Sequence, residues 1–131
     1  MHIVHFMLDC AAQIMHNVHM QEICETDYFA KKADKLLSQE EYETLIATLS
    51  LNPEAGEVIK HTNGLRKMRL ARAGGGKSSG YRVVYFFYTA HCPLMLLDIF
   101  AKNQKENLSK AERNQLAEVA EMIKQAFKRK R

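Results

Sequence analysis

Three β-type segments follow one another in residues 65–101, and they restrict the fold of this 131-residue chain more than any other feature. In Leu65–Arg72, apolar and basic residues alternate, which is the period of a strand with one buried face. Tyr81–Thr89 is β-branched and aromatic on both faces, as in a central strand, and Leu94–Ala101 is nearly as apolar. Because short connections join them, the three segments predict an antiparallel meander.

Helix signals precede the meander. Gln21–Glu25 is expected to form a short first strand, and Asp27 can then cap a helix. Ser38 and Glu41 form a capping box for a second helix, which Asn52–Pro53 would end. Two consecutive amphipathic helices predict a helical hairpin before the sheet.

A second capping box follows the meander, where Ser109 and Glu112 predict the start of a C-terminal helix. Together the patterns predict one α+β domain over residues 20–131, which fits the usual length of a domain. Residues 1–19 hold four of the six histidines and no clear periodicity, so we expect them to be a flexible N-terminal extension.

Charge is distributed unevenly along the chain. Residues 20–57 carry nine acidic and three basic side chains, whereas residues 58–131 carry sixteen basic and five acidic ones. No acidic residue lies between Val58 and Leu97, the region that holds the β-type segments. Since a solvated face normally mixes both signs, this basic sheet predicts a polyanionic partner, and RNA is the leading one.

Several other functions are not expected. Residues 71–78 match a relaxed phosphate-loop pattern, but a strand rather than a helix follows them, which argues against nucleotide binding. The histidines of residues 1–19 lack an accompanying set of cysteine or carboxylate ligands, so neither a metal nor a cofactor is expected. No apolar run approaches the ~20 residues of a membrane span, and we expect a cytoplasmic protein without membrane contact.

Three motifs follow one another along the chain, and their combination is more specific than any one of them: residues 64–70 (GLRKMRL), residues 80–86 (GYRVVYF) and residues 97–109 (LDIFAKNQKENLS). In this combination the chain resembles the RelE/HigB family of type II toxins, most closely the HigB branch. The resemblance implies a microbial-RNase-like fold and a metal-independent endoribonuclease that enters the ribosomal A site, cuts mRNA there and inhibits translation. It also implies a cognate antitoxin, in this branch usually a helix-turn-helix repressor of the HigA type.

The resemblance also assigns site residues. Lys67 and Arg69 match the catalytic basic pair of the family, Arg82 matches the arginine of the GYR strand, and Lys102 follows the last strand as a further catalytic residue. RNA contacts are expected from six more residues: Arg66, Arg72, Lys77, Phe100, Asn103 and Lys105. Two departures from the family concern the acid–base chemistry. Phe100 stands where close relatives often have tyrosine, and residues 98–111 hold no tyrosine, histidine or glutamate apart from Glu106, so a conventional acid–base side chain is missing.

These residue types suit RNA cleavage, in which the 2′-hydroxyl attacks the adjacent phosphate. Arg69 and Arg82 can clamp the phosphate, because a guanidinium binds two oxygens at once and stays charged. Lys67 is the candidate general base and Lys102 the candidate acid. Two alternatives remain open: a non-catalytic RNA- or ribosome-binding module of the same fold, and a passive partner whose basic sheet receives an acidic antitoxin segment.

Overall fold

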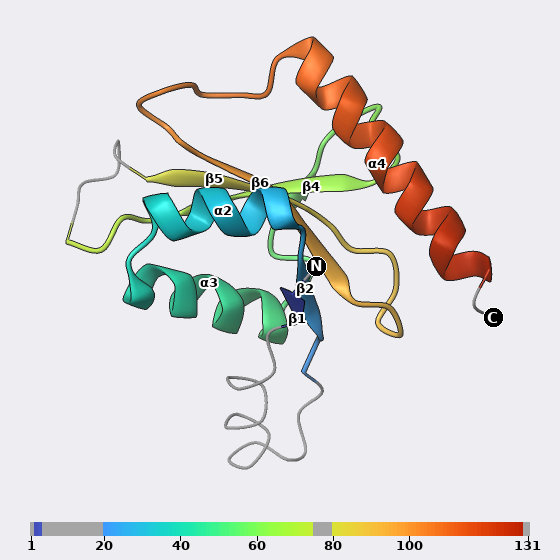
Figure 1. Cartoon of the computed structure of the whole chain (residues 1–131), viewed down its shortest axis with the longest axis horizontal. Helices are drawn as coiled ribbons and strands as arrows, with labels where there is room; N and C mark the ends of the chain where they lie inside the picture. The colour runs from blue at the N-terminus through green and yellow to red at the C-terminus, as the bar shows by residue number, and fades with distance from the viewer. Residues whose placement is uncertain (1, 4–19, 75–79, 130–131) are drawn as a thin grey trace.

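A six-stranded sheet with helices on both faces forms the body of the molecule (Figure 1). The computed structural model describes residues 2–3, 20–74 and 80–129. The strands are β1 (His2–Ile3), β2 (Ile23–Glu25), β3 (Glu57–Val58), β4 (Leu65–Leu70), β5 (Tyr81–Phe86) and β6 (Leu94–Ala101). The helices are α2 (Asp27–Leu36), α3 (Gln39–Leu51) and α4 (Lys110–Arg129). The predicted α+β class is confirmed.

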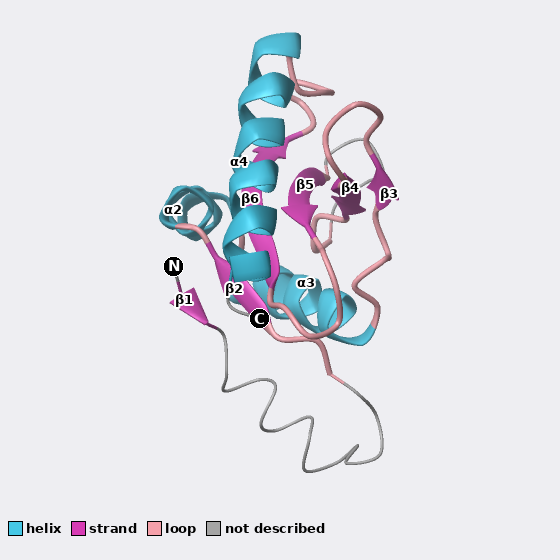
Figure 2. Cartoon of the chain, turned by 90° about the vertical axis from the view of Figure 1, so that its right-hand side faces the viewer, coloured by secondary structure: helices cyan, strands magenta, loops and turns pink. Residues whose placement is uncertain are grey.

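The sheet order is β1-β2-β6-β5-β4-β3, and its centre is the predicted antiparallel meander of β4, β5 and β6. Figure 2 shows these strands side by side, with α4 over one face. β5 ends at Phe86, earlier than expected, and its register shifts between Val84 and Tyr85. The remaining pairings are additions to the prediction: β2 runs parallel to β6, and the two-residue β3 extends the sheet beyond β4.

Residues 1–19 were expected to form a flexible extension. Their flexibility stays a prediction; within them His2–Ile3 form β1, which pairs with β2 with Ile3 opposite Cys24. The prediction for residues 4–19 lies outside the described residues.

Hydrogen bonds at the helix starts explain where the helices begin. The Ser38 hydroxyl accepts from the Glu41 amide, and a Glu41 carboxylate oxygen accepts from the Ser38 amide, so the predicted capping box is confirmed. The expectation that Asp27 caps α2 is wrong by one residue. Thr26 Oγ1 accepts from the Phe29 amide at 3.2 Å, while Asp27 lies in the first turn, where its charge suits the helix dipole.

The core has two parts, one on each face of the sheet. On one face, α2 and α3 pack through residues such as Phe29, Leu45 and Leu49 against Val83 and Tyr85 of β5. On the other face, α4 packs against a second cluster, whose buried members are Cys24, Leu65, Val84, Phe86, Met95, Leu97, Phe100 and Ala120. This second face carries the functional site described below.

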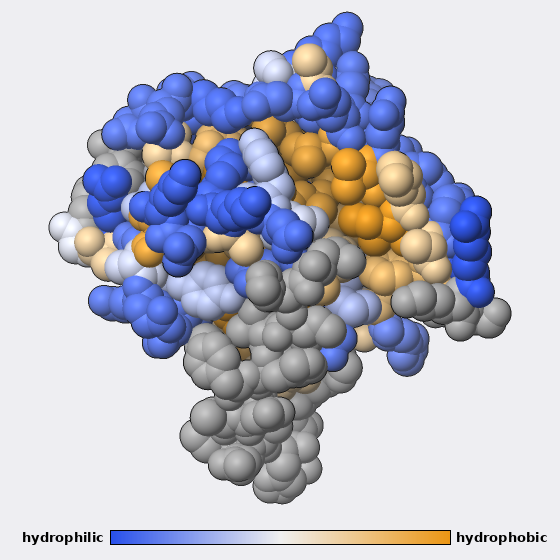
Figure 3. Space-filling model, viewed as in Figure 1, coloured by the Kyte–Doolittle hydropathy of each residue, from blue (hydrophilic) through white to orange (hydrophobic). Residues whose placement is uncertain are grey.

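α4 buries little of its surface against the sheet. Ala120 is its buried residue, and Met122 on the same helix is 70% exposed. Figure 3 shows an apolar area between α4 and the hydrophilic side chains that cover α2. None of the described helices is long and apolar enough to cross a membrane.

Candidate functional site

Register brings three cations to one face of the meander. Alternation along β4 places Lys67 and Arg69 on the same side as the buried Leu65, which belongs to the α4-facing cluster. Arg69 lies directly opposite Arg82 of β5, and Lys67 lies opposite Val84, one of the same cluster. The sequence of the connection between the two strands, residues 71–80, could not fix this register, whereas the ladder of pairs from Leu65–Phe86 to Leu70–Tyr81 does.

These cations have few partners in the part of the chain that the structure describes. Lys67, Arg69 and Arg82 form no salt bridge within residues 20–74 and 80–129. Arg82 Nε is buried and has no hydrogen-bond acceptor among these residues. A buried donor without an acceptor costs free energy, so the arrangement is one that a bound anion would stabilise.

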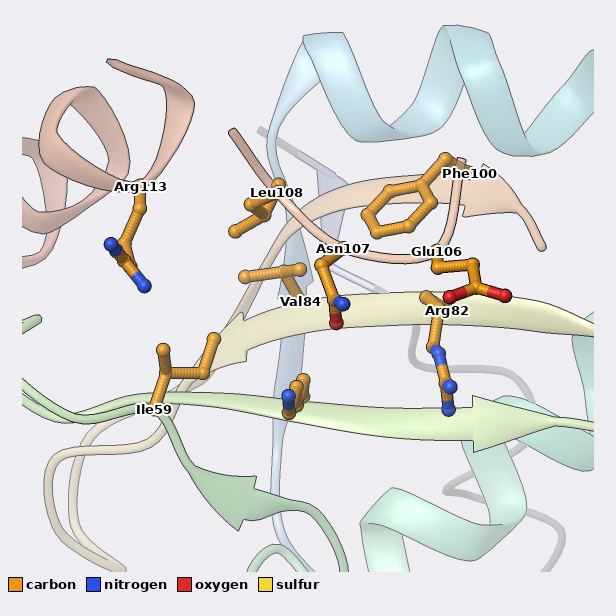
Figure 4. Close-up of a pocket in the computed structure, with 9 residues that line it drawn as sticks. Ile59, Arg82, Val84, Phe100, Glu106, Asn107, Leu108 and Arg113 are labelled. Atoms are coloured by element: carbon orange, nitrogen blue, oxygen red, sulfur yellow. The ribbon is translucent and has the colours of Figure 1, made fainter. Parts of the chain in front are cut away.

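A pocket of about 270 Å³ lies over this face, and we call it the central pocket. Its lining residues come from the sheet, the β6–α4 loop and α4: Ile59, Lys67, Arg82, Val84, Phe100, Glu106, Asn107, Leu108 and Arg113. In Figure 4, Glu106 lies near the Arg82 end of the pocket, Asn107 lies near its middle, and Arg113 reaches in from α4 at the opposite end. The pocket therefore combines three cations with one carboxylate.

Sequence reasoning missed Arg113 and Glu106 as pocket residues. The Ser109–Glu112 capping box did predict the start of α4, and Arg113 is the next residue after Glu112. No local pattern reveals, however, that Arg113 of this helix lines the same pocket as Lys67 of β4 and Arg82 of β5.

A shallower hollow of about 340 Å³ adjoins the central pocket, and Lys67 and Arg82 line both. Glu57 of β3 also lines it and is the register partner of Lys67. The basic segments thus have an acidic neighbour, because the strand β3, which was not predicted, carries a carboxylate to the edge of the basic face.

Other predicted site residues lie elsewhere. Arg66 points to the opposite face of β4, where it donates to the Gly56 carbonyl at 2.7 Å and pairs with Glu54 at 3.3 Å. Arg72 is exposed beyond the end of β4, with its guanidinium 5.6 Å from the centre of the Tyr81 ring. Their contribution to RNA binding stays a prediction.

Two more of the predicted residues do not line the central pocket. Lys102 and Asn103 lie in the turn after β6, where the Lys102 amide donates to the Gly80 carbonyl at 2.9 Å. Lys77 lies outside the described residues. The assignment of Lys102 as an acid has no support from this geometry.

Phe100 and Lys105 form one wall of the site. Phe100 lines the central pocket from β6, and the Lys105 ammonium lies 4.8 Å from the centre of its ring. Glu112 at the start of α4 accepts hydrogen bonds from the Lys105 ammonium and from the Ser109 amide. These two bonds lower the pKa of Glu112 to about 2, and the bond from Lys105 has the larger effect. One carboxylate thus caps the helix and also holds the loop beside Phe100.

The chemistry available here is that of anion binding. Guanidinium and ammonium groups that form no salt bridge among the described residues suit a phosphodiester. Among the described residues, no group of three or more histidine, cysteine or carboxylate side chains could hold a metal ion.

Comparison with known families adds the decisive observation. Residues 54–130 match the model of the family described as the RelE toxin of the RelE/RelB toxin–antitoxin system, which is more than half of the chain. The chain belongs to the RelE toxin family. The matched region of this RelE-family toxin runs from β3 to α4 and includes every residue of the central pocket, whereas α2 and α3 precede it.

Proposed function

We propose that this RelE-family toxin is a ribosome-dependent endoribonuclease that cleaves mRNA in the A site and so inhibits translation. The observation that carries the proposal is the cross-strand cluster of Lys67, Arg69 and Arg82, which lines the hollow of about 340 Å³ beside the central pocket and has no salt bridge among the described residues. Such a cluster matches the charge that accumulates on a phosphodiester during cleavage.

The proposed reaction is attack of an RNA 2′-hydroxyl on the adjacent phosphate. The attack forms a 2′,3′-cyclic phosphate and breaks the bond to the 5′-oxygen of the next nucleotide. One group must accept the 2′-hydroxyl proton, and another must supply a proton to the leaving 5′-oxygen. Arg82 and Arg69 are the proposed clamps for the phosphate oxygens, because their guanidinium groups remain charged throughout.

Proton transfer is assigned to two residues of the central pocket. Lys67 is the proposed proton acceptor, because it lines the central pocket together with Arg82. Glu106 is the proposed second proton-transfer group, in place of Lys102, because its carboxyl group lines the same pocket as Lys67 and Arg82. Arg113, at the other end of the pocket, is proposed to hold a neighbouring phosphate.

Substitution at Lys67 tests the enzymatic function. Lys67→Met is expected to abolish mRNA cleavage on programmed ribosomes, mapped by primer extension, while circular dichroism and urea denaturation show an intact fold. Lys60→Met is the matched control, since Lys60 is an exposed lysine that lines neither the central pocket nor the hollow beside it, and it is expected to retain cleavage. Undiminished cleavage by the Lys67 variant would refute the assignment.

A non-catalytic RNA- or ribosome-binding module is the second candidate. Phe100 favours it, because a phenylalanine cannot transfer a proton where relatives often carry tyrosine. Inhibition of translation without new mRNA ends would select this candidate over the endoribonuclease. Glu106→Gln separates the two further, since it is expected to slow cleavage at least tenfold while leaving ribosome binding unchanged.

The partner and location belong to the same proposal. We propose an antitoxin encoded beside this toxin, of the helix-turn-helix HigA type, and a cytoplasmic site of action where ribosomes are available. Co-expression with the adjacent reading frame tests this, because growth arrest by the toxin alone and rescue by the pair are both expected. A passive partner would leave growth unchanged in either case.

A further inference from the structure

A second hollow lies beside the central pocket, between α2 and the loop from β6 to α4, and we call it the α2 hollow. Its volume is about 360 Å³, and its lining residues are Lys32, Lys35, Leu36, Phe100, Gln104 and Lys105. Phe100 lines this hollow as well as the central pocket, so the two adjoin across a single aromatic side chain.

The α2 hollow combines apolar contacts with a cationic rim. Leu36 and Phe100 supply apolar surface, and three lysines also line the hollow. Two of these lysines are fixed by carboxylates. Lys105 forms a salt bridge with Glu112, and Lys32 Nζ lies 2.6 Å from a carboxylate oxygen of the buried Asp98.

Lys35 differs from the other two lysines. It is exposed in the last turn of α2 and forms no salt bridge with a residue that the structure describes. Among the lysines that line this hollow, Lys35 is therefore the one whose ammonium group is available to bind an anionic ligand. An apolar surface with an unmatched cation at its rim fits the face of a nucleobase and the phosphate attached to it.

We infer that the α2 hollow is a subsite for a nucleotide that flanks the scissile phosphate on the same RNA strand, with Lys35 contacting its phosphate. The inference rests on the proposed function. It extends the RNA path from the strand-edge cations, through the central pocket and past Phe100, onto α2. This helix lies outside the region that matches the toxin family, whereas Phe100, Gln104 and Lys105 lie within it, so the subsite would join the two parts of the chain.

RNA fits the hollow better than an acidic peptide because the hollow continues directly from the central pocket. A strand held by Lys67 and Arg82 has its next nucleotide within reach of Phe100. A peptide carboxylate would use the lysines but would leave the apolar contacts without a planar partner.

Binding of single-stranded RNA to the full chain tests the subsite independently of cleavage. The probe is a short, fluorescein-labelled, 2′-O-methylated RNA, which cannot be cut, and the measurement is Kd by anisotropy over a series of salt concentrations. Lys35→Gln is expected to weaken binding and to reduce the slope of log Kd against log salt by about 0.7, the value for one phosphate contact on a single strand. Lys31→Gln is the matched control, because Lys31 is an exposed lysine of the same helix that does not line the hollow, and its slope should equal that of the wild type.

Amide chemical shifts provide the second readout. The same RNA is expected to shift the signals of Leu36 and Gln104, and Lys35→Gln should reduce these shifts. Equal slopes for the two lysine variants, or no RNA binding by the wild type, would overturn the subsite, as would equal displacement of the probe by polyglutamate at matched charge. A slope change without any ribosomal cleavage would instead leave the subsite standing and reject the endoribonuclease.

Discussion

Removing Arg69 should stabilise this toxin while impairing its function. Arg69 lies directly opposite Arg82 in the β4–β5 ladder, with Lys67 two residues along on the same face. Like charges at directly opposed positions destabilise a strand pair by up to about 1 kcal/mol, and side chains in such pairs start about 5 Å apart. At that separation the Coulomb energy of two unit charges in water is about 0.8 kcal/mol.

Arg69→Gln keeps much of the side-chain length and removes the charge. We therefore expect the free energy of unfolding to rise by about 0.5 kcal/mol at low ionic strength, with a rise of about 2 °C in Tm. The gain should shrink toward zero near 1 M salt, where the Debye length falls to about 3 Å. Urea denaturation at low and high salt measures both effects, and ribosomal cleavage by the same variant should fall.

Arg66→Gln is the control on the same strand. Arg66 donates to the Gly56 carbonyl and pairs with Glu54, so its loss should lower stability by about 1 kcal/mol instead. Two results would contradict this reasoning: a lower free energy of unfolding for Arg69→Gln, or a gain that is the same at every salt concentration. Either would show that repulsion between Arg69 and Arg82 does not destabilise the fold.

Two further predictions concern residues that support the site. Glu112 has a pKa of about 2 in the folded chain against an ordinary value near 4.5, so its stabilising contribution is complete above that ordinary value and is lost as pH falls toward 2. Because 37% of its side chain is exposed to solvent, we expect Glu112→Gln to lower the free energy of unfolding by only about 1 kcal/mol at pH 7. The difference from the wild type should vanish below pH 2. A difference that stays constant across a pH series of urea titrations would contradict this prediction. Gly56→Ala would place a methyl carbon 2.6 Å from the Lys67 carbonyl oxygen and 2.9 Å from the Tyr85 ring, and should cost about 1–3 kcal/mol in urea denaturation, whereas the exposed Ala55→Ser should be nearly neutral.

Local patterns in the sequence were sufficient for most of the framework. Both serine–glutamate capping boxes and the three strands of the meander depend on neighbouring residues, and all are present. Alternation also contained a signal that was not used. Arg66 is one residue from Lys67, so it had to face the other side of β4.

Contacts between distant segments were beyond such patterns. The parallel pairing of β2 with β6 joins residues about 70 positions apart, and the two-residue β3 is too short to carry an alternation of its own. Glu57 and Arg113 enter the site through β3 and α4, whose positions depend on packing of the whole domain. The basic residues of one strand pair could be anticipated, while the carboxylates and the helix that complete the pocket could not.

The two capping-box glutamates each perform a second task with the carboxylate oxygen that the cap leaves over. Glu41 accepts from the Ala73 amide at the base of the β4–β5 loop, and Glu112 accepts from Lys105 in the loop before α4. Both loops border the basic face, so the N-terminal turns of two helices act as tethers for its margins. Substitution of Glu41 or Glu112 should therefore attenuate this toxin by degrees. Every cation of the cluster would remain in the sequence, and only the hydrogen bonds that hold the neighbouring loops would be lost.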